Sequence, residues 1–164
     1  MKQIGLISDT HGFLDSRFLT HLQKCDEIWH AGDIGDLVVS EKLKELAPLK
    51  AVYGNIDNHT IRLEYTEDLR FSCEEMIVFI THIGGYPGRY NQRLVGELMN
   101  NTPDLFICGH SHILKVINDK KLGLLHMNPG AAGNTGIHKV KTMLKFIIDG
   151  KDIRNLEVVE LKRN

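Results

Sequence analysis

The chain has 164 residues, of which 42% are apolar and 25% are charged, and its formal net charge at pH 7 is −1. These proportions are ordinary for a folded globular domain and argue against intrinsic disorder. A near-neutral chain has no overall electric field that would attract nucleic acid or an anionic membrane surface. We therefore expect one domain over residues 1–164, with no stable nucleic-acid binding and no membrane association.

The first third of the sequence predicts alternating strands and helices. Three short apolar runs have the length of buried strands: residues 4–7, 27–29 and 49–53. Apolar residues recur at helical spacing between them: Leu14, Phe18 and Leu22, and then Val39, Leu43 and Leu46. Asp36 can cap the second helix, and Pro48 lies beyond its end. This order is typical of parallel strands joined by crossover helices.

The rest of the sequence predicts strands and one further helix. The expected strands are residues 69–73, 76–80, 105–108, 114–117, 124–127, 143–148 and 153–160. The last two would form a hairpin about Asp149-Gly150. A helix containing Leu94 and Leu98 would end at Asn101-Thr102-Pro103. The expected fold is α/β, with a mixed sheet or two packed sheets flanked by helices.

Three cysteines are widely spaced and include no C-x-x-C pair: Cys25, Cys73 and Cys108. They are typical of buried small hydrophobes in a reducing compartment, and not of a disulfide framework or a thiolate zinc site. The first residues lead into a strand without the pattern of a secretory leader. No apolar stretch approaches the roughly 18 residues of a membrane span. We expect a cytoplasmic protein.

Polar residues with metal-binding chemistry follow five of the predicted strands. The five segments are Ser8-Asp9-Thr10-His11, His30-Ala31-Gly32-Asp33, Tyr53-Gly54-Asn55-Ile56-Asp57, Thr81-His82 and Gly109-His110-Ser111-His112. The carboxyl ends of strands in an open α/β sheet are where ligands bind. Turn chemistry explains any one segment, because Gly, Asp, Asn and Ser favour turns. Five coincident segments indicate instead that their Asp, Asn and His side chains converge on one site.

The spacing within these segments suits metal ligation. In an extended segment, Asp9 and His11 would point to the same side, as would His110 and His112. The glycines would let the backbone turn sharply at each strand end. Imidazole and carboxylate ligands without thiolate suit Mn, Fe, Zn, Co or Ni better than Ca or Mg. Two divalent cations carry a charge of +4 against −2 from two aspartates, so that a dinuclear site would attract phosphate.

Five blocks in this order resemble the signature of the calcineurin-like metallophosphoesterases: Asp9-x-His11, Gly32-Asp33, Gly54-Asn55, His82 and Gly109-His110-x-His112. The chain length and Asn128-Pro129-Gly130 resemble the small prokaryotic phosphodiesterase branch of that superfamily, the YfcE type. The resemblance extends from residue 9 to about residue 130. It implies a sandwich of two packed mixed β-sheets flanked by helices.

The resemblance also implies a dinuclear centre of two divalent transition-metal ions. We expect Mn, with Ni, Zn, Fe and Co as alternatives. One ion would be held by Asp9, His11, Asp33 and His112. The other would be held by Asp33, Asn55, His82 and His110, so that Asp33 bridges the two.

The mechanism that the resemblance implies is in-line attack on phosphorus by a metal-bridging hydroxide. Because water bound to metal is acidic enough to react near neutral pH, no Ser or Cys nucleophile is needed. The candidate catalytic residues are Asp9, Asp33, Asn55 and His82. Asn55 and His82 are also candidate substrate contacts.

Two positions depart from the family pattern. Ile56 stands where many members have a histidine, whereas Asp57 keeps the acidic residue that follows it. The histidine that the family is proposed to use for protonating the leaving group is therefore absent. His82-Ile83-Gly84 replaces the usual His-Gly, which would alter only the loop over residues 84–90. We expect Asp57 to hold a neighbouring ligand by a hydrogen bond.

The other histidines carry weaker signals. His30 is expected to pack beside the site or to support a ligand. His59 could reach the site, although an exposed loop histidine is the commoner case. The remaining three have no spacing argument: His21, His126 and His138.

Three arginines could bind phosphate oxygens: Arg62, Arg89 and Arg93. Arg89 is the candidate substrate contact among them, although a solvated surface arginine is the commoner case for each. Residues 128–133 are rich in glycine but lack the Walker Lys-Ser/Thr, which favours turn chemistry there.

The sequence thus predicts a metal-dependent phosphoric ester hydrolase, specifically a phosphodiesterase acting on a small phosphodiester or nucleotide. No cap domain fits in 164 residues, so we expect a shallow, open site. One alternative is a phosphomonoesterase of the same fold. Another is a protein-interaction scaffold, like the retromer subunit that shares this fold. All seven ligand positions are filled, which favours an enzyme, and a homo-oligomer is compatible with the sequence.

Overall fold

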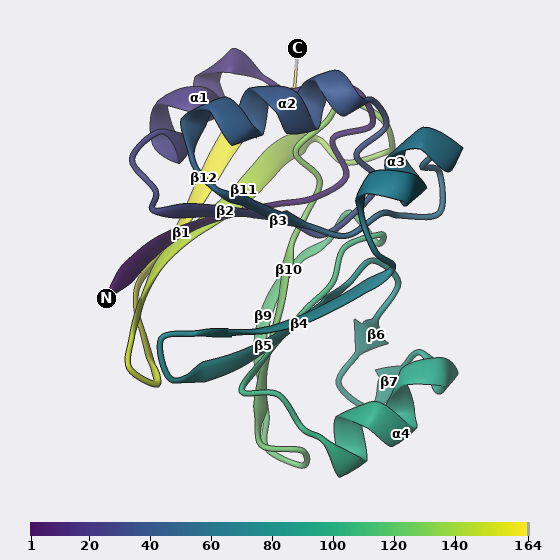
Figure 1. Ribbon diagram of the computed structural model, residues 1–164, viewed down its shortest axis with the longest axis vertical. Helices are drawn as coiled ribbons and strands as arrows, with labels where there is room; N and C mark the ends of the chain where they lie inside the picture. The colour runs from purple at the N-terminus through teal and green to yellow at the C-terminus, as the bar shows by residue number, and fades with distance from the viewer. Residues whose placement is uncertain (164) are drawn as a thin grey trace.

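The computed structural model describes residues 1–163 and contains two five-stranded mixed sheets (Figure 1). The first sheet has the strand order β12-β11-β1-β2-β3. Its strands are β1 (Lys2–Ile7), β2 (Glu27–His30), β3 (Leu49–Ala51), β11 (Val140–Asp149) and β12 (Asp152–Lys162). The connections from β1 to β2 and from β2 to β3 are the helices α1 (Ser16–Leu22) and α2 (Leu37–Leu46).

The second sheet has the strand order β4-β5-β8-β10-β9. Its strands are β4 (Asp68–Cys73), β5 (Met76–Thr81), β8 (Leu105–Ile107), β9 (Leu114–Asp119) and β10 (Leu124–Pro129). Helix α3 (His59–Glu64) precedes this sheet, and helix α4 (Gln92–Asn100) lies between β5 and β8 in the sequence. Strands β6 (Gly85–Tyr86) and β7 (Arg89–Tyr90) form a separate small hairpin.

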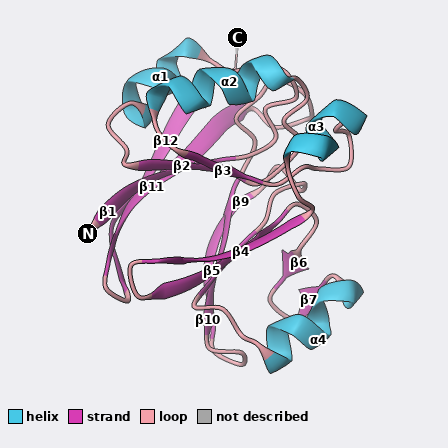
Figure 2. Cartoon of the chain, viewed as in Figure 1, coloured by secondary structure: helices cyan, strands magenta, loops and turns pink. Residues whose placement is uncertain are grey.

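The two sheets pack against each other, and the helices lie outside them (Figure 2). The core between the sheets includes Leu6 and Trp29 from the first sheet and Val78 and Ile107 from the second. Helices α1 and α2 cover the outer face of the first sheet, and α4 packs on the outer face of the second. The predicted fold class, two packed mixed sheets flanked by helices, is confirmed.

The alternation of side chains along β1 shows why the first sheet has two covered faces. Ile4 and Leu6 point into the core between the sheets, whereas Ile7 packs with the helices. Gly5 lies under α1, where an added Cβ would come within 2.7 Å of Leu22 Cδ2. The missing side chain at Gly5 therefore allows α1 to pack closely on the sheet.

Most predicted elements are present, with ends shifted by one or a few residues. Asp36 caps α2, since its side chain accepts a hydrogen bond from the backbone N–H of Val38. The strand expected over residues 49–53 ends at Ala51. Helix α3 and the β6–β7 hairpin were not predicted, because α3 buries only Ile61 and each hairpin strand has two residues. Neither is long enough to show hydrophobic periodicity.

Cys25, Cys73 and Cys108 are buried and free, as expected for small hydrophobic residues. Among residues 1–163, every helix is too short or too polar to cross a membrane.

His126, in β10, is buried among aromatic side chains. Its ring centroid lies 6.1 Å from that of Tyr86, 6.2 Å from that of Tyr90 and 5.8 Å from that of Phe106. Neither ring nitrogen has a hydrogen-bond partner among the described residues. Burial therefore lowers the pKa of His126 to about 4.

We expect His126 to make the fold sensitive to acid. The unfolded chain binds a proton at this residue below its ordinary pKa of about 6.5, whereas the folded chain binds one only near pH 4. Stability should therefore fall as the pH drops through this window, by about 2–3 kcal/mol between pH 7 and pH 4.5. The variant His126→Phe should lack this part of the stability loss. The measurement is the free energy of unfolding of metal-free protein in urea at each pH. The exposed His59→Phe is the control, and an equal acid loss in wild type and His126→Phe would contradict the assignment.

Candidate metal centre

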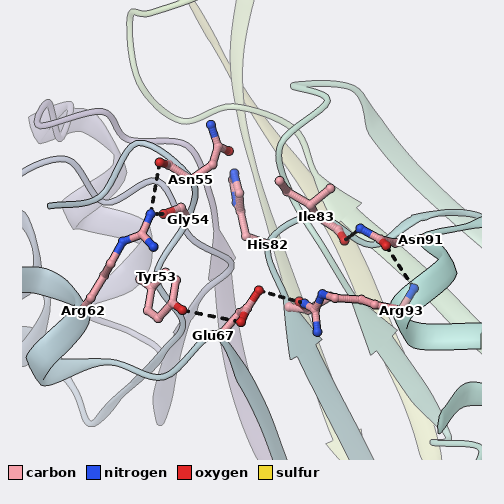
Figure 3. A pocket seen from close by; sticks show the side chains of 10 residues that line it. Tyr53, Gly54, Asn55, Arg62, Glu67, His82, Ile83, Asn91 and Arg93 are labelled. Carbon is pink, nitrogen blue, oxygen red and sulfur yellow. Dashed lines mark hydrogen bonds and ion pairs between the residues drawn. The ribbon is translucent and has the colours of Figure 1, made fainter. Parts of the chain in front are cut away.

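The five polar segments meet where the two sheets adjoin, at the carboxyl ends of β1, β2, β3, β5 and β8. Within the sheets, β1, β2 and β3 run parallel, as do β5 and β8. Six of the seven predicted ligands form two groups: Asp9, His11 and His112, and Asp33, His82 and His110. In each group the ligand atoms lie within 4.8 Å of one another. Figure 3 shows the seventh predicted ligand, Asn55, beside the ring of His82.

Each aspartate has one oxygen held by the protein and one that faces imidazole. Asp9 Oδ2 accepts hydrogen bonds from Ser8 Oγ at 2.6 Å and from the backbone N–H of His110 at 3.1 Å. Its Oδ1 lies 3.2 Å from His112 Nε2. Because the protein holds one oxygen of each carboxylate, the other oxygen has a defined orientation toward the imidazoles.

Asp33 lies between the two groups. Its Oδ1 accepts a hydrogen bond from the backbone N–H of Ile56 at 3.1 Å. Its Oδ2 lies 3.4 Å from His11 Nε2 and 3.2 Å from His82 Nε2. A single carboxylate oxygen thus faces one histidine of each group.

The donor set fits divalent cations. His82 Nδ1 lies 2.8 Å from the carbonyl oxygen of Ala31 and donates to it, which leaves the Nε2 lone pair directed at the aspartates. Three buried atoms in the site have no hydrogen-bond partner in the described part of the chain: Asp9 Oδ1, His11 Nε2 and His82 Nε2. Buried polar atoms are nearly always paired, so a cation is the natural partner for this set.

The electrostatics of the site favour positive charge between the ligands. Burial opposes ionisation of Asp9, but the neighbouring imidazoles of His11 and His112 outweigh burial and hold the pKa of the carboxyl well below its usual range. The Asp9 carboxylate beside His11 in turn raises the pKa of the imidazole above its ordinary value. The carboxylates therefore stay ionised and stabilise a cation.

Five of the predicted ligands have left-handed backbone conformations. The φ angles are 55° for Asp9, 48° for His11, 54° for Asp33, 69° for His110 and 60° for His112. Such angles are uncommon outside glycine and cluster at functional sites. The explanation that Asp-x-His and His-x-His are extended segments is therefore wrong, since tight turns bring these side chains together.

Glycines in the segments make room for ligand side chains. An added Cβ at Gly54 would lie 2.0 Å from Asp33 Oδ1, and one at Gly32 would lie 2.6 Å from His82 Nδ1. Of these two, Gly32 also needs its positive φ of 97°. The close approach of ligand side chains is thus the main reason for glycine at these positions. The sharp backbone turn that the sequence predicted is a second reason.

Asp57 joins two of the ligand loops. Its Oδ2 accepts hydrogen bonds from the N–H groups of Ile34 at 3.0 Å and Gly54 at 2.8 Å, and its Oδ1 accepts one from Gly35 at 2.7 Å. Asp57 therefore has the supporting position that we expected, although it holds backbone next to Asp33 and Asn55, and not a ligand side chain.

Asn128 is a supporting residue whose role sequence reasoning missed. Its Nδ2 donates to the carbonyl oxygen of Gly109 at 2.9 Å and to Ser111 Oγ at 3.1 Å, while its Oδ1 accepts from Gly130 N–H at 3.0 Å. The side chain is completely buried. It thus holds the turn that contains His110 and His112, and the Asn-Pro-Gly sequence was the only signal for it.

The other histidines divide into supporting and distant residues. His30 is buried, accepts from Gly32 N–H at 3.1 Å and contacts Thr10 Oγ1 at 2.9 Å, which matches the packing role expected for it. His138 packs edge-on against His112, with ring centroids 5.3 Å apart. His59 is exposed at the start of α3.

The three candidate arginines do not share one place. Arg62 and Arg93 border a cavity together with Asn55 and His82 (Figure 3). Arg89 lies in β7, where it lines a different hollow that none of the seven predicted ligands borders. The structure therefore does not bring Arg89 to the metal ligands.

Comparison with known proteins agrees with this geometry. Residues 1–151 match the calcineurin-like phosphoesterase superfamily domain. The chain belongs to this superfamily. A relative from Methanocaldococcus jannaschii, named "Probable metallophosphoesterase", is 33% identical over 155 residues, which cover 90% of this chain and 77% of the relative.

Solved structures show the same fold at lower identity. Vps29 from Entamoeba histolytica has a TM-score of 0.77 and 17% identity, and the match covers 99% of each chain. An archaeal phosphodiesterase has a TM-score of 0.67 and 22% identity, covering 96% of this chain and 99% of the other. This calcineurin-like phosphoesterase thus shares its fold with both an enzyme and Vps29.

We expect Asp33→Asn to disturb both ligand groups of this phosphoesterase. Asp33 Oδ2 faces His11 and His82, so neutralising it weakens both positions and leaves two cations with less screening between them. Metal content after equilibration with Mn²⁺ and dialysis should fall from about two ions per chain to fewer than one. The control is Asp152→Asn, at an exposed aspartate on β12. Unchanged metal content in Asp33→Asn would contradict a bridging position.

Proposed function

We propose that the protein is a cytoplasmic phosphodiesterase that uses two divalent transition-metal ions. The observation that carries the proposal is the pair of ligand groups that meet at Asp33 Oδ2. When bound, two such cations neutralise phosphate charge and supply a water acidic enough to attack phosphorus near neutral pH. The buried free thiols support the proposed reducing location.

The proposed ligands of one ion are Asp9, His11, Asp33 and His112, and those of the other are Asp33, Asn55, His82 and His110. His82 is buried and oriented by the carbonyl of Ala31. Asn55 and His110 are exposed and mark the side from which a substrate would approach. The Asn55 amide can donate a hydrogen bond to a phosphate oxygen at this open side.

The choice of a diester over a monoester has two supports. Two of the ligands, Asn55 and His110, are exposed, so a phosphate with two substituents has room. The archaeal phosphodiesterase has the same fold. We propose a small phosphodiester or a nucleotide as substrate, with no role for nucleic-acid or membrane binding.

Removal and replacement of metal tests this function. Four imidazoles are poor partners for Mg²⁺, which prefers oxygen ligands. Chelator-treated protein should therefore regain hydrolysis of bis-p-nitrophenyl phosphate with Mn²⁺, and with Ni²⁺ or Zn²⁺ to a lesser extent, but little with Mg²⁺.

The same assay with p-nitrophenyl phosphate separates the alternatives. Faster cleavage of this monoester would show a phosphomonoesterase. Full activity with Mg²⁺ alone would contradict the transition-metal requirement. Cleavage of neither compound with any metal would contradict a phosphoesterase.

Ile56 at this position predicts that the rate of hydrolysis depends on the acidity of the leaving group. A positioned acid contributes about 10²–10⁴-fold by protonating the departing oxygen. Ile56 cannot donate a proton and is 46% exposed, and His59 is exposed at the start of α3. We expect aryl diesters to be cleaved far faster than alkyl diesters, and Ile56→His to narrow this gap mainly by raising the alkyl rate.

The measurement is kcat/KM across diesters of graded leaving-group pKa for wild type, Ile56→His and His59→Ala. A flat dependence in the wild type would contradict the expectation. If His59→Ala then made the dependence steep, His59 would be the proton donor.

A further inference from the structure

A cavity of about 210 Å³ adjoins the candidate metal centre (Figure 3). It shares two lining residues with the centre, Asn55 and His82. On the other sides it is bordered by Tyr53, Glu67 and Arg93. A substituent on a phosphate held at the metal ligands would therefore extend into this cavity.

Two guanidinium groups form opposite walls of the cavity, and both are held in place. Arg93 Nη1 and Nη2 donate to the carboxylate of Asp68 at 2.7 and 2.8 Å, so an aspartate neutralises this cation. Arg62 stacks on the ring of Tyr53 at 4.6 Å and donates to the carbonyl oxygen of Asn55 at 3.2 Å. These contacts orient both guanidinium groups, and N–H donors therefore lie on both walls.

Glu67 lies at the foot of the cavity, between Tyr53 and Arg93, as Figure 3 shows. The backbone N–H of Tyr53 donates to the carbonyl oxygen of Thr66 at 3.0 Å, which places Glu67 next to Tyr53. The contacts of its carboxylate are long: Oε2 lies 3.5 Å from Tyr53 Oη, and Oε1 lies 3.5 Å from Arg93 Nη2. A carboxylate has about four lone-pair sites, so Glu67 keeps capacity for hydrogen bonds from a ligand.

We propose, on the basis of the proposed phosphodiesterase function, that this cavity binds an ester group of the substrate and that Glu67 selects a polyol. The hydroxyls of a glycerol or sugar group donate to the Glu67 carboxylate and accept from the donors on the walls. Other ester groups fit less well. A second anionic group is repelled by Glu67, and an aryl or alkyl group makes no hydrogen bond to its carboxylate. An ammonium pairs with Glu67 but accepts no hydrogen bond from the donors on the walls.

Matched substrates test this selection. The 2,3-dihydroxypropyl and n-propyl esters of p-nitrophenyl phosphate have the same leaving group and the same chain length, and differ only in the two hydroxyls. Because Glu67 is exposed and its hydrogen bonds compete with water, wild-type protein loaded with Mn²⁺ should favour the dihydroxypropyl ester by about three- to tenfold in kcat/KM. The ratio should fall toward one in Glu67→Ala and less far in Glu67→Gln. The matched control is Glu64→Gln. The Glu64 carboxylate pairs with Lys44 outside the cavity, so this variant should keep the wild-type ratio.

A 2-aminoethyl ester of the same series tests the choice of ligand class. Preference for this ester over the dihydroxypropyl ester would overturn the polyol assignment. A ratio near one between dihydroxypropyl and n-propyl esters in the wild type would overturn it as well, while leaving the phosphodiesterase function in place.

A binding measurement in which no bond is cleaved separates the proposal for the cavity from the proposed phosphodiesterase function. Calorimetric titration with the dihydroxypropyl and n-propyl monoesters of methylphosphonate measures selection by the cavity alone. Selective binding that is lost in Glu67→Ala, without cleavage of any diester, would support the cavity and contradict the phosphodiesterase. Equal binding of both phosphonates would overturn the polyol assignment whatever the enzyme cleaves.

Discussion

The arrangement of the site depends on the orientation of one carboxylate. Asp33 Oδ1 is held by the N–H of Ile56, and for this reason Oδ2 can face histidines of both ligand groups. The contact requires that the loop after β3 lie directly against the loop after β2. Gly54, which has no Cβ to collide with Asp33, and Asp57, which accepts hydrogen bonds from both loops, make this approach feasible.

The packing of the two sheets completes the site, because neither sheet supplies all of the ligands. Asp9, His11, Asp33 and Asn55 follow strands of the first sheet, whereas His82, His110 and His112 follow strands of the second. Backbone hydrogen bonds also connect the loops, including one of 3.0 Å from Asp9 N–H to the carbonyl of Gly32. The apolar core between the sheets therefore fixes the distance between ligands that are far apart in the sequence.

The sequence was sufficient to predict the strands, the fold class and the convergence of the metal-binding side chains. Buried strands have recognisable apolar runs, and the carboxyl ends of parallel strands meet at one edge of each sheet. The local conformations could not be predicted in this way, since nothing in Asp9-x-His11 distinguishes an extended segment from a left-handed turn. Asn128 and Glu67 were also missed, because their partners, Gly109 and Tyr53, are brought to them only by the tertiary fold. Short elements such as α3 bury too little to leave a periodic signal.

The unpartnered atoms Asp9 Oδ1, His11 Nε2 and His82 Nε2 have a consequence for the whole molecule. Groups that have lost their water without gaining a partner raise the free energy of the folded chain, and an ion that satisfies them lowers it again. An unfolded chain scatters the same atoms and offers the ion no comparable site. The resistance of the protein to heat and denaturant is thereby linked to the free concentration of that ion, by RT ln(1 + [L]/Kd), or about 2.7 kcal/mol at one hundred times the dissociation constant. The supply of metal would then set the fraction of molecules that are folded.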